Sequence, residues 1–168
     1  MKMKVNLFYR KSFPYGNFSI EKVFDTILPL FTSDNMYIVN KIILPKYSVG
    51  LINRAINILF TLLKQTDINH ITGDVHYVTL FLKKKNTILT IHDFVILKRN
   101  SGIKKILYYY FWYYIPISKS QYVTVISNTI MKELVDFFPF AKNKTFVVYN
   151  PLTIQYDLIE KKIKILLL

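Results

Sequence analysis

Two kinds of hydrophobic pattern alternate along the chain. Short runs of β-branched and aromatic residues predict buried strands, whereas longer stretches with apolar residues every three or four positions predict amphipathic helices. The short runs place strands at 5–9, 36–44, 68–72, 87–91, 122–127 and 145–150. The periodic stretches place helices at 20–31, 49–66, 74–84, 103–118 and 129–138.

The order of these elements predicts the fold class. Strand and helix alternate until a last strand closes the series, and the connections are short. This order is typical of α/β proteins, in which a Rossmann-like parallel β-sheet is flanked by helices on both faces. A length of 168 residues suits one such domain. The helix at 49–66 carries one apolar stripe, with Asn53, Arg54, Asn57 and Lys64 outside it.

Polar residues and glycines follow the predicted strands directly. In open parallel sheets, ligands bind outside the carboxyl ends of the strands, near the point where the strand order reverses. We therefore expect the candidate ligand-binding rim to be formed by residues at these strand ends. They are Gly16, Gly73, Asp74, His92, Asp93, Ser127 and Asn150.

Histidine and aspartate stand out among these residues. His92 could act as a general base or hydrogen-bond a substrate hydroxyl, with Asp93 orienting or charging the ring. The competing interpretation is that Asp93 caps the next turn while His92 satisfies local backbone groups. We expect Asp74 to cap the helix at 74–84, with His76 in its first turn. His70 falls inside a strand, and we predict no metal site, because His70, Asp74 and His76 match no standard ligand spacing.

Two further segments have two interpretations each. Gly16, in the loop "SFPYGNFS", could let backbone N–H groups approach an anion or could serve a turn that needs positive φ. The aromatic stretch "SGIKKILYYYFWYYIPISKS" could be an interfacial helix with Trp112 at headgroup depth and Lys104, Lys105 and Lys119 facing anionic lipid. Alternatively, it is a core helix that is apolar all round.

Composition and charge narrow the choice of partner and compartment. There is no cysteine, and the longest uncharged apolar run is shorter than the ~18–20 residues that a membrane span requires. We therefore expect a cytoplasmic protein. A net charge of +13 favours anionic partners such as acidic lipid headgroups or nucleotide-linked substrates, although a lysine-rich composition alone would also produce it. No helix-turn-helix, RNP-type or zinc pattern accompanies the charge, so we expect no nucleic-acid partner.

Four motifs carry a resemblance to a known family. "HITGDVHY", "TILTIHDF", "VTVISNTIMKEL" and "FVVYNPL", in this order, resemble the N-terminal half of bacterial GT-B glycosyltransferases of the retaining, family-4-like group. The resemblance runs from Val5 to about Leu152. It implies that His92 and Asp93 line the cleft near the transferred sugar and that Ser127 and Asn128 lie on the same rim.

The resemblance also implies a donor site and a second domain. The loop with Gly16 and Asn17 would approach the donor diphosphate, although the family's double glycine is here "YGN". The donor would be a nucleotide sugar, with no metal or other cofactor. Residues 1–152 would form the acceptor-side domain, and residues 153–168 would be a linker and the first strand of a C-terminal domain that binds the nucleotide.

That second domain bears on activity. Without it, or a homologous partner chain, we expect the domain to be inactive, because the groups that stabilise leaving-group charge would be missing. Such enzymes build lipopolysaccharide, capsule or other surface glycans at the inner face of the membrane, where a basic surface would suit peripheral attachment. The alternatives are an inactive gene remnant or a non-enzymatic module that docks on an anionic membrane or on another protein.

Overall fold

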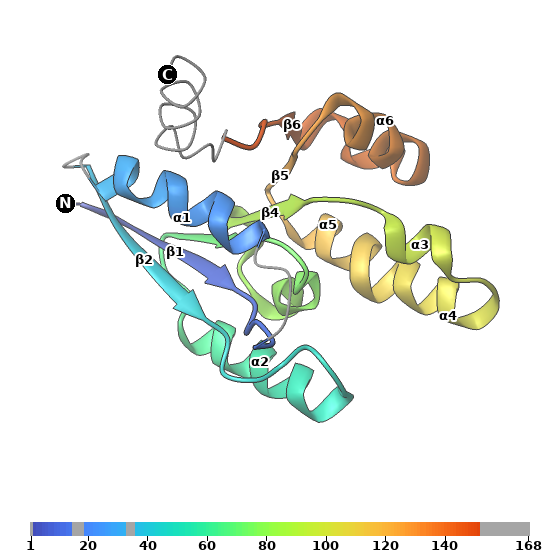
Figure 1. Ribbon diagram of the computed structural model, residues 1–168, viewed down its shortest axis with the longest axis horizontal. Helices are drawn as coiled ribbons and strands as arrows, with labels where there is room; N and C mark the ends of the chain where they lie inside the picture. Colours follow the sequence, from blue (N-terminus) through green and yellow to red (C-terminus); the bar gives the residue numbers. More distant parts are fainter. Residues whose placement is uncertain (1, 15–18, 33–35, 152–168) are drawn as a thin grey trace, which may run out of the picture.

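The computed structural model describes residues 2–14, 19–32 and 36–151, and its centre is one parallel sheet (Figure 1). The strand order is β2-β1-β3-β4-β5-β6, and every neighbouring pair is parallel. This arrangement confirms the predicted fold class. The strands are β1 (Met3–Tyr9), β2 (Tyr37–Ile43), β3 (Ile68–Ile71), β4 (Thr87–Ile91), β5 (Tyr122–Val125) and β6 (Thr145–Val147).

The strand order reverses beside β1. The chain adds β2 on one side of β1 and then returns to place β3 on the other side, after which β4, β5 and β6 follow outward. The carboxyl ends of β1 and β3 therefore flank the switch point at which α/β sheets bind ligands. These two strands are held together by the register that pairs Val5 with Ile68 and Phe8 with Ile71.

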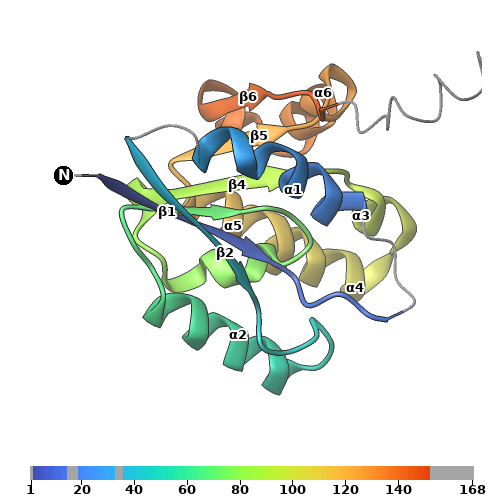
Figure 2. The ribbon, with the colours of Figure 1, turned by 60° about the vertical axis from the view of Figure 1, so that its left-hand side comes forward.

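The helices lie on both faces of the sheet, as predicted. α1 (Ser19–Thr32) covers β1 and β2 on one face, where Leu7, Tyr9 and Phe24 form a small core. The main core lies on the opposite face, and Figure 2 shows α1 and α2 on opposite sides of the sheet. The other helices are α2 (Leu51–Leu63), α3 (Val95–Arg99), α4 (Gly102–Leu107), α5 (Ile115–Lys119) and α6 (Asn128–Phe137).

The prediction of a helix at 74–84 is wrong. The segment forms two short 3₁₀ turns, η1 (His76–Phe81) and η2 (Lys84–Asn86), separated by extended Leu82 and Lys83. Four consecutive residues from His76 to Thr79 are buried. An α-helix on a sheet surface buries only one stripe of its residues, so a run of consecutive buried positions favours tighter, irregular turns.

The aromatic helix exists, with a wider turn at its centre. α4, a π-helical segment η3 (Tyr108–Tyr114) and α5 form one continuous helical stretch. Pro116 has no N–H, so the carbonyl of Trp112 lacks its α-helical donor. His76 replaces that donor, because its Nδ1 lies 2.9 Å from the Trp112 carbonyl oxygen. A carbonyl can only accept, so Nδ1 carries the proton.

Most of the apolar stripe of α2 faces solvent and not the core. An apolar stripe normally faces the core, but here Leu59 and Leu63 are exposed, whereas Asn57 and Thr61 are completely buried. The Asn57 side chain accepts from the Lys46 N–H at 3.0 Å and donates to the Lys46 carbonyl at 2.9 Å. It also donates to the Tyr77 hydroxyl at 3.0 Å. These hydrogen bonds hold Asn57 inward, on a side of α2 where Ile58 and Phe60 also pack against the main core.

Candidate functional site

The predicted rim exists at the carboxyl ends of the strands. Arg10 follows β1, Gly73 and Asp74 follow β3, and His92 and Asp93 follow β4. The parallel register brings these strand ends to one edge of the sheet. Their contacts define two neighbouring groups of side chains, one around His92 and one around Arg10.

His92 is held in a fixed orientation. Its Nε2 lies 2.8 Å from the carbonyl oxygen of Thr72, so Nε2 must donate and, in the neutral ring, Nδ1 is left as an acceptor. The ring lies directly over Gly73: a Cβ at that position would stand 2.6 Å from Cδ2 of His92. Gly73 also has φ +141°, which favours glycine. The glycine therefore creates the space that the imidazole occupies.

Asp93 acts on the backbone in this structure. Its Oδ1 accepts a hydrogen bond from the N–H of Val95 at 2.9 Å, which fixes the start of α3. Its main-chain carbonyl accepts from the Tyr113 hydroxyl at 3.1 Å. The carboxylate is exposed at the rim. Thr72, and not Asp93, therefore orients the His92 ring, and Asp93 performs the capping role that was the alternative interpretation.

Asp74 does not cap a helix, which corrects the prediction. It has positive φ (45°), and its Oδ2 pairs with Nη1 of Arg10 at 2.6 Å. Arg10 also pairs with Glu21 in the first turn of α1, with 2.7 Å between Nε and Oε1. Sequence reasoning missed Arg10, and its signal was a basic residue immediately after the first strand. The pair and its neighbours join β1, β3 and α1 around the switch point.

The ionisation of Glu21 depends on these partners. Partial burial opposes its charge and would raise the pKa of the carboxyl. The hydrogen bonds from Arg10 and Ser12 outweigh that effect and hold the pKa below its usual value. Glu21 is therefore an ionised anchor for Arg10 at neutral pH.

The remaining predicted rim residues are placed as follows. Ser127 is the N-cap of α6, because its hydroxyl accepts from the N–H of Ile130 at 3.3 Å. Asn128 is exposed and donates to the Tyr149 hydroxyl at 3.0 Å. Gly16 and Asn17 lie outside the described residues. Within the described residues, no three histidine or acidic side chains gather closely enough to hold a metal ion.

His76 and Trp112 lie inside the protein. Burial lowers the pKa of His76 to about 4, so the ring is neutral and serves the Trp112 carbonyl. The indole of Trp112 is buried between His76, Tyr77 and Arg54, whose guanidinium lies 5.1 Å from the indole ring. The prediction that Trp112 faces a membrane is therefore wrong, because its ring fills the contact between α2 and the aromatic helix.

The three lysines of that prediction are accessible. Lys104 and Lys105 are exposed in α4, and Lys119 is exposed at the end of α5. Throughout the described ranges, we find no helix with the length and apolar content needed to cross a bilayer.

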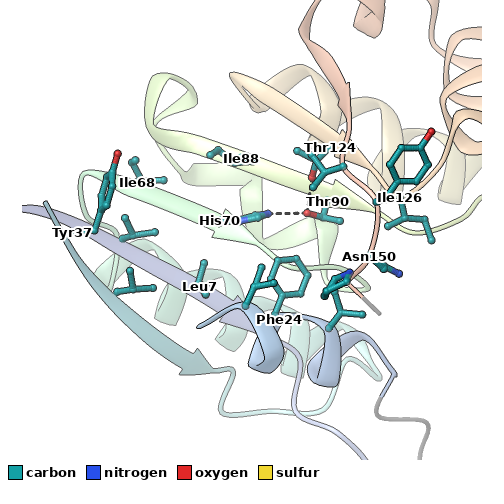
Figure 3. Close-up of a pocket in the computed structure, with 17 residues that line it drawn as sticks. Leu7, Phe24, Tyr37, Ile68, His70, Ile88, Thr90, Thr124, Ile126 and Asn150 are labelled. Carbon is teal, nitrogen blue, oxygen red and sulfur yellow. Dashed lines mark hydrogen bonds between the residues drawn. The ribbon is translucent and has the colours of Figure 1, made fainter. Parts of the chain in front are cut away.

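A hollow of about 400 Å³ lies on the face of the sheet that α1 only partly covers (Figure 3). Its floor carries a chain of polar groups across three strands: Nε2 of His70 lies 2.7 Å from the Thr90 hydroxyl, which lies 2.7 Å from the Thr124 hydroxyl. Burial, with a smaller contribution from His92, lowers the pKa of His70 to about 4. His70 lies inside a strand, as predicted, and its ring is satisfied by Thr90.

Comparison with known families identifies the domain. The family model for Glycosyltransferase Family 4 matches residues 29–156, which is most of the chain and includes His92, Asp93, Ser127 and Asn128. The match begins after β1 and after Gly16 and Asn17. A search of curated proteins gives no match. The fold, the rim and the family match agree, and the chain therefore belongs to glycosyltransferase family 4.

Proposed function

We propose that this chain is the acceptor-side domain of an enzyme that transfers a sugar from a nucleotide-sugar donor to a cell-surface glycan or glycolipid. The observation that carries the proposal is the fixed geometry of His92 at the rim. Its Nε2 is engaged by Thr72 and its ring is seated on Gly73. An imidazole whose orientation is fixed in this way is preorganised, so it need not be reoriented when a ligand binds.

The chemistry assigned to His92 is hydrogen bonding through Nδ1. In the neutral ring this nitrogen can accept a hydrogen bond from a sugar hydroxyl or take its proton. Asp93 adds an exposed negative charge beside it, which favours the partial positive charge that forms on the transferred sugar. Ser127 and Asn128 belong to the same rim and would contact the substrate, whereas Gly16 and Asn17 would approach the donor diphosphate.

Sugar transfer also requires groups that stabilise the departing nucleotide diphosphate. The proposal assigns them to a C-terminal domain or a homologous partner chain, which would face the rim across a cleft. The domain boundary would lie near Leu152, with residues 153–168 as linker and first strand. By itself the acceptor-side domain would be inactive, and no metal or other cofactor is assigned to it. The setting we propose is lipopolysaccharide or capsule synthesis at the inner face of a bacterial membrane.

The test is a sugar-transfer and donor-hydrolysis assay over a panel of nucleotide sugars, with and without a C-terminal domain of the same family, either fused or as a partner chain. We expect activity only with the partner. His92→Gln should lower it at least about tenfold, because glutamine can still donate to a carbonyl but has no basic nitrogen. Lys142→Gln, an exposed substitution away from the rim, should leave the rate unchanged.

Three other results would count against the proposal. Equal activity of His92→Gln and the unsubstituted chain would remove His92 from the reacting centre. Inactivity of a folded mixture with every donor would indicate a gene remnant or a docking module. Full activity of the chain alone would show that its own residues bind the nucleotide.

A further inference from the structure

α2 presents an apolar stripe to solvent. Leu51, Ile52, Leu59 and Leu63 are 82%, 78%, 57% and 75% exposed. The polar side of the same helix is turned inward, where Asn57 and Thr61 are 0% exposed. A helix that buries Asn57 and Thr61 and leaves these four apolar side chains in water favours contact with a further apolar surface, because that contact would remove the apolar side chains from water.

The stripe continues onto two neighbouring segments. Leu51 and Phe111 line the same groove between α2 and the aromatic helix. Leu59 and Phe81 line a second groove beside α2. Phe81 and Phe111 are themselves 61% and 59% exposed. We call this set the α2 surface. Its residues are Leu51, Ile52, Leu59, Leu63, Phe81 and Phe111.

The charges around the α2 surface are mostly positive, and exposed Asp67, just beyond the end of α2, is the nearest carboxylate along the chain. The segments that form it, residues 49–66, 76–86 and 102–119, contain no aspartate or glutamate. They carry exposed lysines just after α2, within α4, at the end of α5 and in the turns between β3 and β4. These are Lys64, Lys83, Lys84, Lys85, Lys104, Lys105 and Lys119.

An apolar surface whose neighbouring charges are mostly lysines is complementary to a bilayer that contains acidic lipid. Leucine and phenylalanine enter the boundary between headgroups and acyl chains, and lysine pairs with lipid phosphate. A second copy of the chain is a poor fit, because the same basic segments would face one another and repel. The C-terminal domain expected for this family would face the carboxyl rim, whereas α2 lies below the sheet in Figure 2.

We propose that the α2 surface rests on an anionic bilayer, with α2 lying in the plane of the interface. This extends the proposed membrane setting by naming the residues that make the contact. It does not depend on sugar transfer, because lipid binding and activity are measured separately.

The first test is flotation of the full chain with vesicles of phosphatidylcholine alone or with three tenths phosphatidylglycerol. Binding should require the acidic lipid and should weaken as salt rises. The double substitution Leu59→Gln and Leu63→Gln should weaken partitioning by about tenfold or more. Replacing Lys83, Lys84 and Lys85 by glutamine should weaken it by a similar factor, about tenfold.

The matched control lies on the edge strand β2. Ile38 and Ile43 are 42% and 55% exposed, similar to Leu59, but they lie outside the α2 surface. Ile38→Gln with Ile43→Gln should bind vesicles as the unsubstituted chain does. Thermal unfolding of each variant ensures that folded proteins are compared.

A second measurement reports how deeply the α2 surface enters the bilayer. In vesicles with brominated acyl chains, Leu63→Trp should be quenched, whereas the emission of buried Trp112 in the unsubstituted chain should change little. Equal binding of the leucine and control variants would overturn the proposal. Concentration-dependent dimerisation that Leu59→Gln abolishes, without vesicle binding, would assign the surface to a second copy instead.

Discussion

At the scale of single residues, the site depends on the absence of a side chain at Gly73. We expect Gly73→Ala to lower the free energy of unfolding by about 1–3 kcal/mol, because alanine at φ +141° is strained and its Cβ would meet the His92 ring at 2.6 Å. The imidazole would be displaced from the Thr72 carbonyl. Urea unfolding measures the first effect, and the NMR signals of the His92 ring report the second.

Gly102 provides the control for this substitution. It also has positive φ (55°), but a Cβ there would meet nothing within 4 Å. Gly102→Ala therefore reports backbone strain alone. If the two substitutions cost the same and the His92 signals stay in place, the proposed contact between Gly73 and His92 does not restrict the ring.

Two other histidines should make stability depend on pH. Burial lowers the pKa of both His70 and His76 to about 4, whereas an unfolded histidine has a pKa of about 6.5. Between these values the unfolded chain binds more protons than the folded chain, so stability is complete above about pH 6.5 and is lost as pH falls toward 4.

The test is the urea midpoint as a function of pH. We expect His76→Asn to reduce the slope between about pH 6.5 and 4, because the asparagine amide can still donate to the Trp112 carbonyl but does not titrate. An unchanged slope would mean that His76 is protonated as readily in the folded chain as in the unfolded chain. His70, which retains its Thr90 partner, should account for the remaining slope.

At the scale of elements, α2 is held by the polar contacts of Asn57 together with partly buried Ile58 and Phe60, and not by its exposed leucines. Asn57→Leu should cost about 2–4 kcal/mol, because it removes the side-chain partner of the Lys46 N–H and carbonyl and leaves the Tyr77 hydroxyl with Ser48 alone. Leu59→Gln, on the exposed side, should change stability by less than about 0.5 kcal/mol. Thermal unfolding of the two variants in the absence of lipid measures the difference, and a larger cost for Leu59→Gln would contradict the observed packing.

The same helix shows what sequence reasoning could and could not predict. The alternation of continuous and periodic apolar runs was sufficient for the parallel sheet, because each run is a local signal. The rotation of α2 depends on Lys46 and Tyr77, and the burial of Trp112 depends on Arg54 and His76. These partners are distant in sequence, and no local pattern specifies them.

The candidate site was predicted to a similar extent. Strand ends indicated the rim, and the structure places His92 and Asp93 there, while their roles in the site stay predictions. The assignment of Asp74 as a helix cap failed because its partner, Arg10, belongs to another strand. Only the strand order, which brings β1 beside β3, joins the two residues.

At the scale of the whole molecule, the rim and the α2 surface serve separate contacts. The rim lies at the carboxyl ends of the strands, where a sugar acceptor and a second domain would meet. The α2 surface lies on one face of the sheet, opposite α1 (Figure 2). A domain resting on a bilayer through α2 would keep the rim free for a substrate carried by that bilayer.

The domain boundary gives the last prediction. Every buried apolar residue of the two described cores lies between Leu7 and Ala141. We therefore expect a chain that ends at Leu152 to unfold cooperatively, with a free energy within about 1 kcal/mol of the full chain. Circular dichroism and urea titration of both lengths make the comparison. A large loss of stability would instead mean that residues 153–168 cover the hollow on the α1 face, since Tyr149 and Pro151 already line it. In that case residues 153–168 would belong to this domain and would not form a linker to the next.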